Sequence, residues 1–298
     1  VMQEYCTQAG GTLTVDMQQV TARSGSNIRY KGTDFECGQH VLRAGTLLQP
    51  HMLGLVAAAG YGKVKARKTP VVTIITTGDE IIQAESMAAT PAEDFQMVDS
   101  ASPMVRALLE KHAGAQCYIR HAPDELALIT KALSDALEVS DLIVTIGGAS
   151  VGSKDYMNQA MDDAGISRQF WKIAMQPGKP LIFGQKGAVP VVGLPGNAIS
   201  AFVCSFLYLV PLLRACVGLK PEHSVKTATL TVGISAGGPR RKFLRATLAT
   251  QNGASTITPL NDQDSSLVSQ LALAQALIIQ RENSPTIPPN TQVQYLTL

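Results

Sequence analysis

Residues 71–80 read Val-Val-Thr-Ile-Ile-Thr-Thr-Gly-Asp-Glu, and the fold class can be inferred from them. It is an apolar run of strand length closed by hydroxyl, glycine and acidic residues, which is typical of a strand buried on both faces of a sheet. Similar runs follow at Cys117–Ile119, Leu142–Ile146 and Val189–Val192, and helical patterns separate them. The sequence therefore predicts a largely parallel sheet covered by helices on both faces, which is a three-layer α/β/α domain.

The helices around these strands have recognisable starts. Ser102 and Pro103 supply an N-cap and a proline at the first helical position, and Pro123 opens the next helix. A last helix is expected over residues 198–216. We assign residues 69–217 to this central α/β domain. The expected buried stripe of the helix after Pro123 is Leu126, Ile129, Leu133 and Leu137.

One uncharged stretch, Gly187–Leu213, is long enough to cross a bilayer. It is divided by four residues that favour a turn, namely Gly193, Pro195, Gly196 and Asn197. We interpret it as a buried strand, a turn and a core helix, and we predict no membrane span.

The segment before this domain follows a β pattern. Short runs such as Gly11–Val15 and Asn27–Tyr30 alternate polar and apolar residues, and a short apolar helix is expected over Pro50–Gly60. We expect a partial N-terminal, β-rich and linker region over residues 1–68. The chain has no initiator methionine, and it opens in what reads as the end of a strand, which predicts an N-terminally truncated chain.

Beyond the domain, over residues 218–298, alternating patterns return and predict a small β-barrel or sandwich. The predicted strands are Thr227–Val232, Phe243–Leu248, Ser255–Pro259, Ala276–Gln280 and Gln292–Leu296. The predicted fold is thus a multidomain α/β protein, with a central α/β/α domain flanked by a mostly β segment and a small β domain.

Charge and composition exclude several classes of protein. The chain has 298 residues, is 45% apolar and 16% charged, and carries a formal net charge of +2 from scattered charges, so neither a nucleic-acid groove nor a basic membrane surface is indicated. Its five cysteines form no C-x-x-C and its histidines form no H-E-x-x-H, which argues against a disulfide framework or a zinc site. Cys117 and Cys204 lie in apolar runs, where buried reduced thiols are usual, and this favours the cytoplasm.

Ligands of open parallel sheets bind outside the carboxyl ends of the strands, and three such ends carry unusual residues here. Thr76–Glu80 places hydroxyls and two carboxylates there, although acids near a helix N-terminus explain the same pattern. Gly147–Tyr156 has small residues that let backbone N–H groups approach a phosphate. Gly193–Asn197 is either a rigid binding loop or a simple turn.

A further segment, Trp171–Pro180, carries Lys172 and Lys179, which are either cations at the same end of the sheet or solvated side chains. The sequence lacks a Walker lysine motif, a Rossmann glycine motif with its downstream acid, and a G-x-S-x-G elbow. Ordinary nucleotide kinases, dehydrogenases and hydrolases are therefore disfavoured. Carboxylates, N–H groups and cations together fit an anionic ligand with Mg²⁺.

Five ordered motifs resemble one known family. They are Thr77-Gly78-Asp79-Glu80, Asp99-Ser100, Gly147–Gly152 with Asp155-Tyr156, Pro177–Pro180, and Leu194-Pro195-Gly196-Asn197. Their order and spacing resemble the molybdopterin molybdenumtransferases, which include the gephyrin E domain. The resemblance extends to residues 240–245 and 263–266, so it covers essentially the whole chain, although Gln176 and His121-Ala122 depart from the usual lysine and acidic pair.

The resemblance implies an enzyme of molybdenum cofactor biosynthesis that inserts molybdate into adenylylated molybdopterin, with Mg²⁺-dependent release of AMP. It also implies a cytoplasmic homodimer that takes its substrate from a molybdopterin adenylyltransferase and serves molybdoenzymes. On this basis Asp79, Glu80, Asp155, Lys172 and Lys179 are the expected catalytic residues.

The same resemblance implies the binding residues. Asp34, Glu80 and Asp155 are the expected metal ligands. The expected pterin- and phosphate-binding residues are Thr77, Gly78, Ser100, Gly147, Gly148, Ser150, Gly152, Pro177, Gly178, Pro195, Gly196, Asn197 and Ser265. We expect Asp79, Gly148, Asp155 and Pro195 to gather in one cleft.

Two other functions fit parts of the sequence. An adenylyltransferase that acts one step earlier shares the central domain, but the flanking β segments argue against it. A pterin-binding scaffold without catalysis is the second, because the family's N-terminal motifs that complete the site are not found ahead of Val1.

Overall fold

The computed structural model describes residues 1–18, 20, 25–26, 28–84, 93–148, 156–221, 223–251 and 253–298. The chain divides into two compact units, Val1–Val64 and Lys65–Leu298. The candidate site lies in the second unit.

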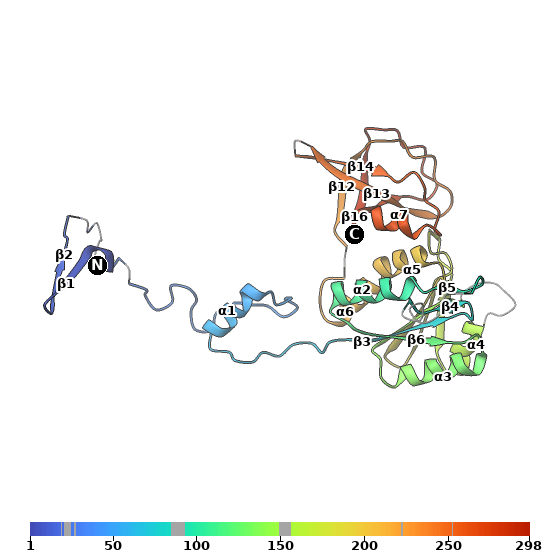
Figure 1. Cartoon of the computed structure of the whole chain (residues 1–298), viewed down its shortest axis with the longest axis horizontal. Coiled ribbons are helices and arrows are strands. Elements are labelled where there is room, and N and C mark those ends of the chain that lie inside the picture. Colours follow the sequence, from blue (N-terminus) through green and yellow to red (C-terminus); the bar gives the residue numbers. More distant parts are fainter. Residues whose placement is uncertain are drawn as a thin grey trace. The chain divides into compact units, whose positions relative to one another are not determined.

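The first unit holds a hairpin and one helix. Strands β1 (Cys6–Ala9) and β2 (Thr12–Val15) pair antiparallel after a short 3-10 helix, Gln3–Tyr5, and α1 spans Pro50–Ala58 (Figure 1). None of the described side chains of this unit is buried.

The strand expected over Asn27–Tyr30 is wrong for the residues that are described there. Residues 28–30 adopt no regular structure, and Asn27 lies outside the described residues. The Ile28 N–H donates to the Gly25 carbonyl, and the Thr33 N–H donates to the Tyr30 carbonyl. Turn hydrogen bonds therefore occupy this backbone in place of a strand partner.

The second unit is built around a six-stranded sheet in the order β6-β3-β7-β11-β10-β8. Its parallel part contains the predicted strands, which the structure confirms as β6 (Gln116–Ala122), β3 (Val71–Thr77), β7 (Leu142–Ile146) and β11 (Val189–Leu194). Two antiparallel strands that were not predicted, β10 (Ile182–Lys186) and β8 (Ser167–Trp171), extend the sheet. All five residues of β8 are exposed, so this edge strand lacks the continuous apolar run that marks the others.

Helices cover both faces of this sheet, as expected (Figure 1). On one face, α2 (Ala101–Ala113) packs with α5 (Ala198–Cys204) and α6 (Val210–Cys216) against Val72 and Ile74. The opposite face is covered by α3 (Leu126–Leu137) and α4 (Tyr156–Asp163). Alternate residues of β3, β7 and β11 therefore enter two separate cores.

The start of α2 differs from the prediction. Ser102 lies inside the first turn, and the N-cap position belongs to Ser100. The Asp99 carboxylate accepts the N–H groups of Ala101 and Ser102 and also the Ser102 hydroxyl. A buried aspartate thus does the capping that the sequence pattern assigns to Ser102.

The long apolar segment Ala198–Cys216 runs through α5, a π-helical stretch over Ser205–Leu209, and α6. Within the described part of the chain it is the one helical segment long and apolar enough to cross a membrane, with a mean hydropathy of 1.8. It is also 56% buried, and Val203, Leu209 and Leu213 belong to the core between the sheet and α2. This packing agrees with the core helix predicted from the sequence.

The C-terminal strands form a closed barrel, which decides between the barrel and the sandwich. Its sheet order is β14-β12-β16-β15-β13-β9, and β13 also pairs with β14 to close it. The strands are β9 (Met175–Gln176), β12 (Val225–Leu230), β13 (Arg241–Gln251), β14 (Ala254–Pro259), β15 (Ala276–Gln280) and β16 (Gln292–Thr297), with α7 (Val268–Leu273) between β14 and β15.

A short parallel pair, β4 (Ile81–Ile82) and β5 (Met97–Val98), follows the end of β3. It brings the Thr77–Glu80 turn close to the start of α2, because the Met97 N–H donates to the Glu80 carbonyl.

Candidate functional site

A cavity of about 530 Å³ lies at the carboxyl ends of the parallel strands, and we call it the strand-end cavity. Most of its lining comes from the turns after β3 and β7, from the starts of α2 and α5, and from one barrel loop. Among the residues predicted from the sequence, those that line it are Thr77, Gly78, Glu80, Ser100, Gly147, Gly148, Gly196, Asn197 and Ser265.

Thr77 and Gly147 form the tightest part of this cavity. Gly147 and Gly148 have φ values of +97° and +64°, which side chains rarely adopt. A Cβ atom on Gly147 would lie 2.8 Å from the Thr77 carbonyl oxygen and 2.9 Å from its Oγ1. The Thr77 hydroxyl is buried and has no hydrogen-bond partner among the described residues. A buried hydroxyl without a partner beside two glycines is suited to an anionic ligand.

The acidic residues at this end have different environments. The exposed Glu80 carboxylate folds back on Gly78, where an added Cβ would lie 2.8 Å from Oε2. Asp79 does not line the cavity, and its Oδ1 accepts the Asp124 N–H at 3.0 Å. Asp124 lines the cavity and has no assigned role in the sequence prediction. Asp99 also lines it, but its carboxylate caps α2.

The rest of the predicted glycine loop lies outside the described residues. This applies to Ser150, Gly152 and Asp155, so their predicted roles are neither supported nor opposed by geometry. Pro195 is buried and does not line the cavity that Gly148 lines. Of the four residues expected to gather in one cleft, Gly148 lines this cavity, Asp79 and Pro195 do not, and Asp155 lies outside the described residues.

The donors fit a Mg²⁺ ion that is shared with a substrate. Across the described ranges, no group of three or more His, Cys, Asp and Glu side chains is placed to hold a metal ion. Mg²⁺ is commonly held by one or two carboxylates and by substrate phosphates, and Glu80 and Asp124 supply such a pair at the cavity. Asp34 is exposed in the first unit.

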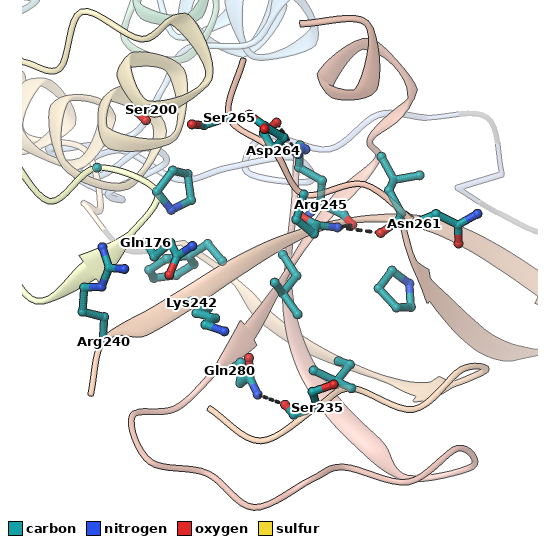
Figure 2. A pocket seen from close by; sticks show the side chains of 18 of the residues that line it. Gln176, Ser200, Ser235, Arg240, Lys242, Arg245, Asn261, Asp264, Ser265 and Gln280 are labelled. Atoms are coloured by element: carbon teal, nitrogen blue, oxygen red, sulfur yellow. Dashed lines mark hydrogen bonds between the residues drawn. The ribbon is translucent and has the colours of Figure 1, made fainter. Parts of the chain in front are cut away.

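A second cavity, of about 770 Å³, lies between the α/β domain and the barrel, and we call it the basic cavity (Figure 2). The turn after β9 contributes Pro177, Gly178 and Lys179, all three predicted site residues. The barrel contributes three further cations, and α5 contributes Ser200 (Figure 2). The barrel cations are Arg240, Lys242 and Arg245.

Arg245 is the most unusual residue of this cavity. Its side chain is 1% exposed, and its Nη2 donates to the backbone carbonyls of Asp262 and Asp264 at 3.1 and 3.0 Å. Its Nε has no hydrogen-bond partner within the part of the chain that the structure describes. Burial lowers the pKa of the guanidinium, which the two aspartates oppose. A buried cation with an unused donor can stabilise an anion in the cavity.

No site role was expected from the sequence for Arg245, Lys242 or Ser200, although Lys242 and Arg245 lie in the 240–245 segment that carries the family resemblance. A signal for Arg245 was present, because the period of two in β13 places it on the same side as Phe243, and both are buried. A cation in phase with a core residue is uncommon without a functional reason.

Lys172 and Lys179 do not lie together in a described cavity. Lys179 lines the basic cavity, whereas Lys172 is exposed and its Nζ lies 3.7 Å from the centroid of the Trp171 ring. Ser265 lines both the basic and the strand-end cavity. The two cavities are therefore neighbours at Ser265. Acidic residues line the strand-end cavity, and most of the charged residues that line the basic cavity are cations.

Comparisons with known proteins agree with this architecture. Family models match over three ranges: the "MoeA N-terminal region (domain I and II)" over residues 1–60, the "probable molybdopterin binding domain" over 73–215, and the "MoeA C-terminal region (domain IV)" over 227–298. The chain is 32% identical over 291 residues to molybdopterin molybdenumtransferase 2 of Mycobacterium tuberculosis, covering 96% of this chain and 70% of the relative. The chain belongs to the molybdopterin molybdenumtransferase family. The resemblance inferred from the motifs is thereby confirmed.

Other members of the family agree. The Haemophilus influenzae molybdopterin molybdenumtransferase is 34% identical over 242 residues, which cover 80% of this chain and 58% of the relative. The crystal structure of a molybdopterin biosynthesis moeA protein from Pyrococcus horikoshii matches 100% of this chain and 71% of its own, with a TM-score of 0.79 and 24% identity. A molybdenum cofactor biosynthesis protein from Pyrococcus furiosus matches with a TM-score of 0.67 at 22% identity, covering 90% of this chain and 82% of its own. These structures share the fold.

Proposed function

We propose that this chain acts in molybdenum cofactor biosynthesis as a molybdenumtransferase, inserting molybdate into adenylylated molybdopterin with Mg²⁺-dependent release of AMP. The observation that carries the proposal is that Ser265 lines both cavities. A ligand in the strand-end cavity and an oxyanion in the basic cavity would meet at this residue.

The strand-end cavity would hold the phosphate end of the pterin substrate. The backbone around Gly147 and Gly148 is open to close approach, and the Thr77 hydroxyl is a donor that no described residue uses. Glu80 and Asp124 would hold Mg²⁺ against the diphosphate, and from the family resemblance Asp155 would add a third carboxylate. When bound, Mg²⁺ offsets the charge of the phosphates.

The basic cavity would hold molybdate. Lys179 and Arg245 line it with two further cations, and they would lower the cost of placing an oxyanion beside a phosphorylated substrate. Lys172 lines neither described cavity, so we assign the oxyanion to Lys179 and Arg245.

We extend the proposal to a cytoplasmic homodimer that receives the adenylate from an adenylyltransferase and passes the finished cofactor to molybdoenzymes. The apolar helix α1 supports a dimer, because none of its residues is buried within its own unit. Leu53, 53% exposed, is one such residue. Apolar surface of this kind is usually covered by a partner.

The activity can be tested with the purified chain, adenylylated molybdopterin and molybdate, with and without Mg²⁺. We expect AMP release and cofactor formation that depend on both molybdate and Mg²⁺. Consumption of ATP with unmodified molybdopterin would instead identify an adenylyltransferase. Tight pterin binding without AMP release would identify a scaffold.

The meeting point of the two cavities has its own test. Ser265→Ala removes a hydroxyl where the two ligands would meet, and we expect about a fivefold lower rate of AMP release, since one hydrogen bond contributes about 1 kcal/mol. Ser269→Ala changes an exposed serine on α7 and is the matched control. Equal rates in the two variants would contradict the role of Ser265.

A further inference from the structure

The turn that carries Lys179 into the basic cavity depends on contacts from outside that cavity. Gln176, Pro177, Gly178 and Lys179 all line the basic cavity. On one side the turn is anchored to the barrel, because Met175 and Gln176 pair with β13. Its other anchors come from the long helical segment that starts at α5.

Each of these contacts from the helical segment is a hydrogen bond that involves one sulfur atom. The Cys204 thiol, at the end of α5, donates to the Gly178 carbonyl with an Sγ–O distance of 3.7 Å. The Tyr208 hydroxyl, in the π-helical stretch, donates to the Met175 Sδ at 3.4 Å. One helical segment therefore contacts the turn at two points, on either side of Gln176 and Pro177.

The packing between Cys204 and Gly178 leaves no spare space. Gly178 has a φ of +110°, and a Cβ atom there would collide with the Cys204 Sγ and lie 3.3 Å from the Met175 Cε. Cys204 itself is 0% exposed. The shape of the turn and the position of the thiol are thus mutually dependent.

The chemistry of Cys204 favours a structural contact over reactivity. Burial raises the pKa of its thiol to about 12, so the sulfur keeps its proton at neutral pH. A protonated, enclosed thiol is a poor nucleophile and a poor metal ligand, but it can donate a weak hydrogen bond.

We propose that Cys204 and Tyr208 are positioning residues that fix the Met175–Lys179 turn, so that Lys179 meets the oxyanion in the basic cavity. This inference rests on the proposed function for the identity of the oxyanion. The contacts to Gly178 and Met175 carry it independently of that identity.

Binding of molybdate to the full chain, measured by equilibrium dialysis, tests the role of Cys204. We expect Cys204→Ala to weaken binding about tenfold and Cys204→Ser, which keeps a donor, to restore most of it. Cys117→Ala is the matched control, because Cys117 is a buried free thiol of the same core whose pKa is also raised to about 12. It contacts no part of the turn in a described hydrogen bond, so we expect wild-type affinity.

A double variant separates positioning from general loosening of the core. If Cys204 acts through Lys179, Cys204→Ala should weaken molybdate binding by less than about twofold once Lys179 is already alanine. A full effect of Cys204→Ala in that background would overturn the proposal, as would equal affinity in Cys204→Ala and Cys117→Ala.

Hydrogen exchange of the unliganded chain tests the turn without any ligand. The amides of Gln176, Gly178 and Lys179 should exchange at least about fivefold faster in Cys204→Ala and in Tyr208→Phe than in wild type or Cys117→Ala. Unchanged exchange in both would overturn the positioning role alone. Equal molybdate affinity in wild type and Lys179→Ala would instead overturn the proposed oxyanion cavity, and with it the part of this inference that concerns Lys179.

Discussion

The Oδ1 atom of Asp79 lies 3.0 Å from the backbone nitrogen of Asp124, whose N–H it accepts. This bond ties the turn after β3 to the segment that leads into α3. The neighbouring Glu80 makes no such bond in the described hydrogen bonds, and its carboxylate lines the strand-end cavity. These two adjacent acids, both expected from the sequence to be catalytic, therefore have different positions.

Exchanging each acid for its amide should separate their roles. Asp79→Asn keeps the Oδ1 acceptor, so we expect AMP release within about threefold of wild type. Glu80→Gln removes a charge that would hold Mg²⁺, and we expect a loss of about a hundredfold or more. Rates are to be compared at equal folded concentration, checked by thermal melting. Equal losses in both variants would contradict this division.

Gly147→Ala should be more disruptive than an alanine at another glycine of positive φ. Gly147 would meet the Thr77 backbone at 2.8 Å, whereas Gly187, with a φ of +57°, has open space around it. We expect Gly187→Ala to cost about 1 kcal/mol in the free energy of unfolding, and Gly147→Ala to cost at least about 2 kcal/mol with loss of pterin binding. Urea denaturation measures the difference, and equal costs would show that the Thr77 contact is unimportant.

Arg245→Met should separate stability from function. The guanidinium is buried and bonds to backbone carbonyls, so replacing it with an apolar chain of similar length removes a desolvated charge. We expect the free energy of unfolding to change by less than about 1 kcal/mol and molybdate affinity to fall at least about tenfold. Denaturation and equilibrium dialysis on the same preparation provide the two readouts. A variant that unfolds but binds normally when folded would contradict the assignment.

Acid should destabilise the chain through two histidines. The Phe206 ring lies between His112 and His223, with centroid distances of 6.3 and 4.3 Å. Burial lowers the pKa of both imidazoles, Arg214 lowers both further, and only the bond from His223 to the Phe206 carbonyl acts in the opposite direction. Because the unfolded histidines, with a pKa of 6.5, bind protons more readily, the free energy of unfolding should fall as pH drops through 6.5 toward the lower folded values.

The measurement is urea denaturation at about pH 7.5 and about pH 5.5. A variant with glutamine at positions 112 and 223 should show a clearly smaller difference between the two conditions than wild type. An unchanged difference would assign the pH dependence to other groups.

The sequence predicts the four parallel strands of the central sheet and misses its two antiparallel strands, β10 and β8. Strand β3 is a continuous apolar run because helices cover both of its faces, and its boundaries can be read directly. Strand β8 exposes every residue and carries no such signal. Capping of α2 is misassigned for a similar reason, because Ser102 fits the pattern of an N-cap while the buried Asp99 supplies the acceptors.

For the candidate site, positions at strand ends are predictable and the division into two cavities is not. Thr77 and Gly147 follow apolar runs, so the sequence places them at one edge of the sheet. Lys179 and Arg245 are 66 residues apart in numbering (245 − 179), and they share a cavity because a short segment pairs with a distant barrel strand. Local sequence patterns do not indicate that a short segment such as β9 pairs with a strand as distant in the sequence as β13.

That pairing also limits how modular the protein is. Strand β9 belongs by sequence to the α/β domain, yet it extends the barrel sheet through Met175 and Gln176. The barrel that follows residue 217 therefore uses two residues from before that position. In a chimera that replaces residues 218–298 with those of a relative, the new barrel strand would have to pair with residues 175–176 of this chain. We therefore expect such a chimera to fold only when residues 175–176 are exchanged together with the barrel.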